Sequence, residues 1–485
     1  MAGHQCHLRL WHDIHDRRLR PPIGEAQQAI FDTGHQVGDL ARDRYPGGHF
    51  VEHDYRNIPA ALSETQRLIE EDAAPALFEP AFQYNNVLAR VDVLECIPDG
   101  GWRIVEVKST TRCKPEHIPD VAVQLWVLRG AGLDIREAGV LTLNRDYIYD
   151  GIQLDLDALF AFHPVLDEAD ALLESIGTEI SDMQTMLAAD SAPDIQPSQH
   201  CFKPYECPYY AHCTRNIPQP EHGIRELSGI SADRREQLES MGVTEVRDVP
   251  ANFPLNQLQS VIRQAVIDGG DTVHGDLARS LAGIAPPVRH LDFETFQPAI
   301  PRFAGTRPYD QIPFLFSVRT ELDELSHDHT DYLHEDDSDP RPALIERLLE
   351  ALGHEGSICT YSSFERMQLK ALAAAFPQYT DALDDIIARL VDLLPIVSGN
   401  YYHPDFHGSF SIKSVLPVVA PGLGYDDLKI ADGQLASIWY ARALASVNST
   451  EKRQIFDNLR KYCARDTLAM VELRKTLLAV MQANT

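Results

Sequence analysis

Alternation of apolar and polar residues predicts a strand in "RHLDFETF" (289–296). Leu291 and Phe293 fall on one face of this strand, and Asp292 and Glu294 fall on the other. Two like charges side by side in a protein interior are costly unless a cation compensates them. Alone, the pattern fits equally well a strand that holds a divalent metal and an exposed strand face with two solvated acids.

Helical periodicity predicts a long final helix over residues 451–482. Tyr462 and Asp466 lie four residues apart, so they share one face of this helix. An aspartate on an apolar stripe needs a partner inside the fold. The apolar residues of that stripe are Ile455, Leu459, Met470 and Leu473.

A second helix is predicted to begin near Ser362, after a strand, with Glu365 on its inward face beside Leu369 and Leu372. Ser362-x-x-Glu365 also fits a capping box, in which the glutamate only accepts a hydrogen bond from the N-cap amide. Both a metal-binding role and a capping role therefore remain open for Glu365.

A further acidic pattern lies in "NNVLARVDVLECIPDGGWRIVEVKSTT" (85–111), which predicts two strands around the turn "PDGG". Asp92 is expected on the first strand, and Glu106 and Lys108 share a face of the second. Two carboxylates that hold a metal, with a lysine that polarises water, are typical of one class of nuclease site. A half-exposed amphipathic hairpin with a surface ion pair is the alternative.

Three cysteines lie six residues apart in "CFKPYECPYYAHC", namely Cys201, Cys207 and Cys213. Ligation of zinc or of an iron–sulfur cluster needs a fourth ligand. The other cysteines, Cys96, Cys113, Cys359 and Cys463, lie on strand or helix patterns and are interpreted as packing residues. The histidines show no metal-ligand spacing, so none is assigned as a ligand.

The composition bounds the class of protein. The 485 residues carry a formal net charge of −29, which argues against a general polyanion binder. A nucleic-acid enzyme stays possible, because its basic groove can be local and its metals supply positive charge. No apolar run is long enough to span a membrane, and no signal peptide is recognised, so a cytoplasmic location is expected.

The chain is expected to be an α/β protein in three parts. Residues 1–220 mix helices with short strands and end in the cysteine-rich segment, and residues 286–485 start with the strand at Asp292. Residues 221–285 read as small helices around "MGVTEV". This middle part is either a helix-hairpin-helix-like element, which binds phosphates through backbone amides, or a helical spacer.

The C-terminal part resembles the DnaQ-like, DEDD-type 3′–5′ exonucleases of the RNase H-like fold. The matching motifs are Asp292-x-Glu294, Phe364-Glu365 and Tyr462-x-x-x-Asp466, with smaller similarities at Asp392-Leu393 and in "FSIKSVLP" (410–417). Glu365 departs from the family, which has aspartate there. The resemblance implies two Mg²⁺ or Mn²⁺ ions held by the four carboxylates, with Tyr462 orienting the attacking water.

The N-terminal part resembles the RecB-like, CRISPR-associated branch of the PD-(D/E)xK nucleases, some of which carry an iron–sulfur clasp. This resemblance implies that Asp92 and Glu106 bind the metal and that Lys108 and Gln124 take part in catalysis. Two family positions differ, because Gly38 stands where a metal-binding histidine is common and Leu128 where a tyrosine is common. The implied ligands of a [4Fe–4S] cluster, with Zn²⁺ as the rival, are Cys6, Cys201, Cys207 and Cys213.

Together the two parts resemble a bacterial family that joins a RecB-like nuclease module to a DnaQ-like exonuclease domain. The expected function is metal-dependent cleavage of nucleic acid, with DNA ends favoured over RNA, in repair or phage defence. Two alternatives stay open. One is a nucleic-acid-binding iron–sulfur scaffold in which one or both nuclease sites have decayed. The other is an RNA-processing 3′–5′ exonuclease.

Overall fold

The computed structural model describes all residues except 54–55, 99, 324–325 and 484–485. Asp99 of the predicted turn therefore lies outside the described residues. The chain forms two compact units, each mixing helices with strands, so the predicted α/β class is confirmed. Unit 1 comprises Met1–Ile217 and Pro298–Asp310, and unit 2 comprises Pro218–Gln297 and Gln311–Thr485. The predicted middle part, 221–285, lies within unit 2.

Unit 1 is built on a six-stranded mixed sheet with the order β1-β2-β5-β6-β7-β8. The central strands β5 and β6 are antiparallel, whereas β6 and β7 are parallel. A separate hairpin is formed by β3 (Ala81–Tyr84) and β4 (Val87–Arg90). The sheet strands are β1 (His49–Phe50), β2 (Ala76–Phe78), β5 (Val93–Cys96), β6 (Trp102–Lys108), β7 (Ile135–Leu143) and β8 (Phe160–Pro164).

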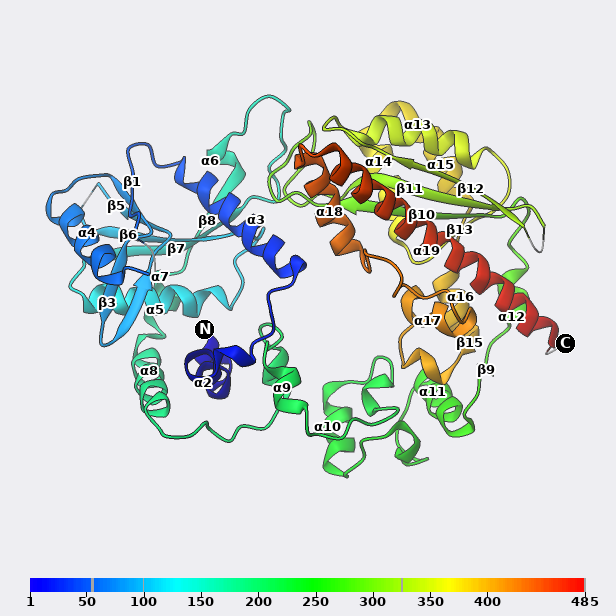
Figure 1. The fold of residues 1–485 in the computed structure, drawn as a ribbon, viewed down its shortest axis with the longest axis horizontal. Helices are drawn as coiled ribbons and strands as arrows, with labels where there is room; N and C mark the ends of the chain where they lie inside the picture. The colour runs from blue at the N-terminus through cyan, green and yellow to red at the C-terminus, as the bar shows by residue number, and fades with distance from the viewer. Residues whose placement is uncertain (54–55, 99, 324–325, 484–485) are drawn as a thin grey trace. The chain divides into compact units, whose positions relative to one another are not determined.

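Both faces of this sheet are covered (Figure 1). Ile104 of β6 packs into a cluster that contains Leu125 of α5 (His117–Gly130). Val105, which points the opposite way, packs into a second cluster with Val37 of α3 (Glu25–Arg42). The other helices of this unit are α1 (Ala2–Gln5), α2 (His7–His15), α4 (Ile58–Glu70), α6 (Leu156–Leu159), α7 (Leu166–Asp170), α8 (Leu173–Leu187) and α9 (Tyr210–Thr214).

The segment Pro298–Asp310 follows a strand of unit 2 in sequence but belongs to unit 1. Ala299 and Ile300 pack in the same apolar cluster as Val105, and the Tyr309 hydroxyl donates to the carbonyl of Ser109. The sequence pattern did not predict this excursion.

Unit 2 contains a five-stranded sheet with the order β12-β11-β10-β13-β14. Three strands form an antiparallel meander, and β13 and β14 run parallel to β10. The predicted strand at Asp292 is β10, at the centre of the sheet. The strand bounds are β10 (Arg289–Phe296), β11 (Ile312–Glu321), β12 (His327–Leu333), β13 (Ile358–Thr360) and β14 (Leu390–Asp392).

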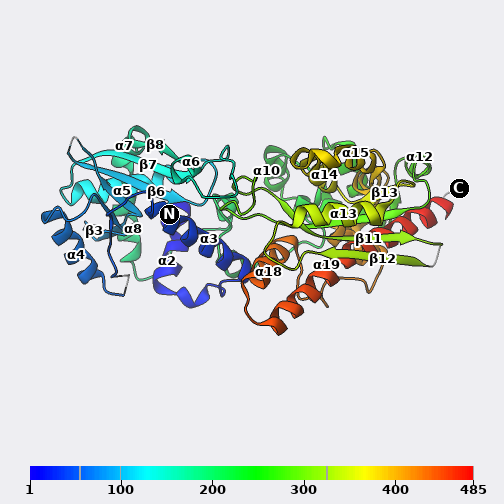
Figure 2. The same cartoon turned by 90° about the horizontal axis from the view of Figure 1, so that it is seen from above.

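Helices cover both faces of this sheet (Figure 2). Leu291 and Phe293 pack with residues of α13 (Pro340–Leu352), α14 (Phe364–Ala375) and α15 (Thr380–Ala388). The helices α18 (Gly433–Ala445) and α19 (Ser449–Ala483) contact β10, and α19 contacts β11 as well. The predicted alternation is therefore observed, with Leu291 and Phe293 facing an apolar layer and Asp292 and Glu294 facing away from it.

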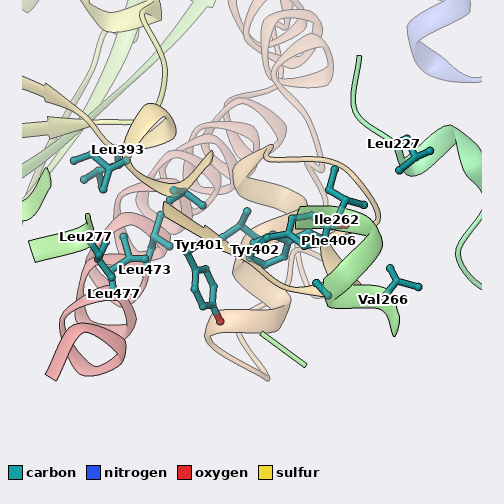
Figure 3. Close-up of a cluster of buried hydrophobic side chains, with 14 of the residues drawn as sticks. Leu227, Ile262, Val266, Leu277, Leu393, Tyr401, Tyr402, Phe406, Leu473 and Leu477 are labelled. Carbon is teal, nitrogen blue, oxygen red and sulfur yellow. The ribbon is translucent and has the colours of Figure 1, made fainter. Parts of the chain in front are cut away.

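A second core of unit 2 joins the 218–285 region to the C-terminal elements (Figure 3). Leu227, Ile262 of α11 (Gln257–Asp268), Tyr402 and Leu473 share this cluster. The remaining elements are α10 (Ala232–Ser240), α12 (Leu277–Leu281), α16 (Leu393–Asn400), α17 (Ile412–Val419), β9 (Thr272–Val273) and β15 (Tyr401–Tyr402). Within the described residues, no helix has the length and apolarity needed to cross a membrane.

Candidate metal centres

Three elements of unit 2 bring four carboxylates to one place. Asp292 and Glu294 come from β10, Glu365 from the first turn of α14, and Asp466 from α19. Their mutual repulsion is expressed in their pKa values. Burial, and then the charges of Asp466, Glu294 and Glu365, raise the pKa of Asp292 well above its ordinary value. Burial, and then Asp466, raise that of Glu294 in the same way. We refer to this set as the carboxylate centre.

The environment of Glu365 bears most directly on what this centre could hold. Its side chain is 2% exposed, and its Oε2 atom is buried without a hydrogen-bond partner. Burial, and to a smaller extent the charges of Asp392 and Asp466, raise its pKa to about 8. A buried carboxylate oxygen without a partner is costly unless a cation or a proton satisfies it.

The capping alternative for Glu365 is wrong. The N-cap residue of α14 is Ser363, whose side chain makes no capping hydrogen bond, and Ser362 Oγ accepts from the Phe364 amide at 3.2 Å rather than from Glu365. The Ser362 amide, which the glutamate would have to accept from, donates instead to Asp392 Oδ1 at 2.8 Å. Asp392 also accepts from the Leu394 amide at the start of α16. Asp392 therefore orders the backbone in front of α14, and its charge and that of Asp466 both act on Glu365.

The helix α19 contributes Tyr462 and Asp466 on one buried face, as predicted, and also Cys463. The Cys463 thiol lies 3.2 Å from Asp292 Oδ2, and the ligand atoms of Asp292, Glu294 and Cys463 all lie within 4.8 Å of one another. The interpretation of Cys463 as a simple packing residue is therefore wrong, because its sulfur contacts an acid of the centre.

Two residues outside the predicted set complete the surroundings. The Tyr425 hydroxyl donates to Asp466 Oδ1. The Lys413 ammonium of α17 lies 5.3 Å from the centre of the Tyr462 ring, and its charge lowers the pKa of both Glu294 and Asp466. Burial still dominates at Asp466, whose pKa is raised to about 6. Lys413 sits within the stretch 410–417, but its approach to the acids depends on the folded position of α17.

In metal-free protein, we expect the free energy of unfolding to fall as pH rises from 5 to 8.5. The Glu365 carboxyl has a pKa of about 8 in the folded chain against an ordinary value of 4.5, so the folded state holds the proton more tightly. Its contribution is complete below the ordinary pKa and is lost as pH rises through 8. This difference corresponds to about 5 kcal/mol at most. Thermal unfolding in EDTA measures the slope.

The matched variants for this measurement are Glu365→Gln and Glu350→Gln, the latter on the exposed face of α13. Glu365→Gln should flatten the pH dependence, and Glu350→Gln should leave it unchanged. Mn²⁺ should raise the melting temperature of wild type more at pH 8.5 than at pH 6, because the ion replaces the lost proton as counter-charge. Equal pH slopes for Glu365→Gln and wild type would contradict the assignment.

Unit 1 holds a second group of acids around β6. Glu106 is buried, and its two oxygens are both used: Oε1 accepts from Lys108 Nζ at 2.6 Å and Oε2 from Gln124 Nε2 at 2.6 Å. Asp92 lies immediately before β5 rather than on a strand continuous with β4, and its Oδ2 accepts from the Val107 amide at 2.6 Å. The four predicted residues therefore do come together.

Two acids join this group that the sequence pattern did not single out. Asp120, in the first turn of α5, accepts from Lys108 Nζ at 2.7 Å. Glu79 adds to the repulsion that, after burial and the charge of Glu106, raises the pKa of Asp92. Asp120 precedes Gln124 by four residues, so helical spacing could have indicated that the two share a face.

The position of the missing histidine is open in the structure. Gly38 lies on α3, and a Cβ atom added there would meet no atom within 4 Å. His35 on the same helix is exposed. The helix thus has room for a ligand at position 38 but does not supply one.

The four cysteines predicted as ligands also gather in unit 1. Cys6, Cys201, Cys207 and Cys213 line one cavity of about 10 Å³. Gln5 fastens the N-terminal helices to the cysteine-rich segment by donating to the carbonyls of His200 and Tyr205. Burial raises the pKa of the Cys207 and Cys213 thiols, with the neighbouring cysteines adding to the effect. Cys6 and the last of the other three are 207 residues apart in the sequence, so folding alone assembles this set.

Comparison with known proteins adds little about function. A family model described as a domain of unknown function (DUF2779) matches residues 289–411, which include Asp292, Glu294 and Glu365 but not Asp466. An uncharacterized protein of Mycoplasma genitalium, MG366, is 25% identical over 206 residues, which are 38% of this chain and 31% of the relative. The chain thus spans less than a third of that relative's length. No solved structure matches.

Proposed function

We propose that this protein is a metal-dependent nuclease and that unit 2 carries a DnaQ-like 3′–5′ exonuclease site. The observation that carries the proposal is the carboxylate centre, in which Glu365 Oε2 is buried without a partner beside three further acids. Four acidic oxygen donors suit Mg²⁺ or Mn²⁺. The strand order, with an antiparallel meander followed by two parallel strands, also supports an RNase H-like fold.

In this proposal each residue of the chain has a distinct task. Bound Mg²⁺ or Mn²⁺ would supply an activated water and stabilise the leaving oxygen. Asp292, Glu294, Glu365 and Asp466 would hold the ions, and Tyr425 would fix the orientation of Asp466 through its hydroxyl. Tyr462 is buried beside Asp466 and would orient the attacking water. Lys413 would offset part of the negative charge while no substrate is bound.

The test is a nuclease panel with Mn²⁺ on 3′- and 5′-labelled single- and double-stranded DNA and RNA. A 3′–5′ exonuclease should release mononucleotides from the 3′ label first and leave a 5′-labelled ladder. DNA is the proposed substrate, and equal or faster degradation of RNA would favour RNA processing instead. Absence of cleavage on every substrate would refute the nuclease proposal.

For unit 1 we propose a RecB-like nuclease site together with a [4Fe–4S] cluster. The convergence of Asp92, Glu106, Lys108 and Gln124 supports the first part. The four cysteines line one cavity, which supports the second part. Zn²⁺ is the alternative occupant, because four thiolates would also complete its coordination.

A specific observation favours the scaffold alternative for unit 1. Both oxygens of Glu106 are already paired, one oxygen of Asp92 is bound by a backbone amide, and position 38 offers no histidine. These hydrogen bonds already satisfy the acids without a metal. Unit 1 would then hold nucleic acid while unit 2 cuts it.

Lys108→Met separates these two roles of unit 1. If unit 1 is a nuclease, this variant should lose all cleavage that remains in an Asp292→Asn background, because the ammonium bound to Glu106 and Asp120 is removed. Lys114→Met, which changes a neighbouring lysine paired with Glu116, is the control. Gel-based cleavage assays measure both. If the Asp292→Asn background has no remaining activity, the scaffold role is favoured.

A further inference from the structure

Two histidines and a glutamate meet in unit 2 outside the carboxylate centre. His222 Nδ1 lies 3.0 Å from Glu226 Oε2, and His407 Nδ1 lies 3.1 Å from Glu226 Oε1. One ligand atom from each of the three residues lies within 4.8 Å of the other two. His222 and Glu226 are four residues apart, but His407 is separated from Glu226 by 181 residues. The sequence therefore gave no ligand spacing that included all three.

The backbone on both sides of this group is held by the second core of unit 2. Leu227 and Phe406, which adjoin Glu226 and His407, are fully buried in the cluster shown in Figure 3. A Cβ atom at Gly408 would lie 2.1 Å from the Glu226 carbonyl oxygen, so only glycine allows this close approach. The His222 amide also donates to Glu245 at 3.1 Å. The backbone that carries the three side chains is thus held in place by the fold.

Charge balance in this group suits a divalent cation. The imidazole rings of His222 and His407 are stacked with centroids 5.2 Å apart, and the Nδ1 atom of each ring faces a different oxygen of the Glu226 carboxylate. Two imidazolium ions this close would repel each other, whereas neutral imidazole is a good ligand for Zn²⁺. Those nitrogen–oxygen separations are 3.0 and 3.1 Å, and one donor atom from each residue lies within 4.8 Å of the other two, which is close enough for the three residues to share one ion.

The group is accessible on one side only. His222 is 8% exposed, whereas the His407 side chain is 57% exposed and lines a surface cavity of about 550 Å³. A fourth ligand can therefore come from solvent, and an ion can enter from that side. The competing interpretation is that His222 and His407 each form only an ion pair with Glu226 and bind no metal.

We propose that His222, Glu226 and His407 bind one Zn²⁺, with a water molecule as the fourth ligand. The ion would join the 218–285 region to the loop after Phe406 within unit 2. This site is separate from the carboxylate centre and from the four cysteines, and it does not depend on nuclease activity.

The test measures zinc content per chain at a fixed, buffered concentration of free Zn²⁺. The variants are His407→Asn and Glu226→Gln, and the control is His354→Asn, which changes an exposed histidine on another loop of unit 2. The cysteines and the carboxylate centre are intact in every protein, so their contribution cancels. We expect His407→Asn and Glu226→Gln each to hold one Zn²⁺ fewer than wild type, and the control to match wild type.

A second measurement checks that the variant is folded. His407 has a left-handed backbone (φ 49°), which asparagine adopts readily, so His407→Asn should fold like wild type. In EDTA its melting temperature should equal that of wild type, and on addition of Zn²⁺ the wild type should gain stability that the variant does not. Equal zinc content in His407→Asn and wild type, with equal zinc-induced stabilisation, would overturn the proposal.

Discussion

Asp292→Asn should reduce the proposed metal-dependent 3′–5′ cleavage by a factor on the order of 10³ or more, because it removes one charge from the centre of the proposed metal site. Asp292 lies on the central strand β10, and the charges of Asp466, Glu294 and Glu365 all act on it. Initial rates on a 3′-labelled single strand with Mn²⁺ measure the effect.

The same substitution should stabilise the metal-free protein. Burial and three neighbouring acids raise the pKa of Asp292, so its ionised form is disfavoured in the folded state. Asparagine has the same shape and no charge, so the melting temperature in EDTA at pH 8 should rise. A gain in stability together with a loss of activity separates a lost metal ligand from a misfolded protein.

The control for this prediction is Asp328→Asn on the exposed strand β12. It should change neither the cleavage rate nor the stability in EDTA. If the double variant Asp292→Asn/Lys108→Met cleaves at the wild-type rate, the carboxylate centre is not the nuclease site. If the single variant Asp292→Asn is active and the double variant is inactive, unit 1 accounts for the activity.

Cys207→Ser should remove essentially all bound iron from anaerobically purified protein and should destabilise unit 1. The four cysteines line one small cavity and connect the N-terminal helices to the end of the unit, so a cluster there would hold two distant segments together. Free energy of metal binding of this kind contributes directly to folding. Iron analysis and the visible absorption that the proposed cluster would give measure the loss.

Cys96→Ser is the matched control, because Cys96 lies at the end of β5 and is not among the cysteines that line the cavity. It should keep the colour and the iron content of wild type. If the wild-type protein is colourless and contains zinc in place of iron, and Cys207→Ser loses one equivalent of that zinc, the four cysteines bind Zn²⁺ and not a cluster. Retention of iron in Cys207→Ser would exclude Cys207 as a ligand.

Local sequence patterns located most residues of the two acidic centres. Alternation on β10 placed Asp292 and Glu294 on the face opposite Leu291 and Phe293, and helical spacing placed Tyr462 and Asp466 together on α19. Periodicity predicts such features because the direction of a side chain depends only on the dihedral angles of its own element. The same reasoning could not decide whether Glu365 caps α14, because that depends on where Asp392 lies in the folded chain.

Only the tertiary structure decided the contacts between segments that lie far apart in the sequence. The excursion Pro298–Asp310 into unit 1, the contact of Cys463 with Asp292 and the meeting of His407 with Glu226 are all of this kind. Packing between elements determines such contacts, and no local period encodes it. The sequence by itself thus determined which side chains share the faces of strands and helices. Only the folded chain decided which of those faces meet, and hence which acids, thiols and histidines can share an ion.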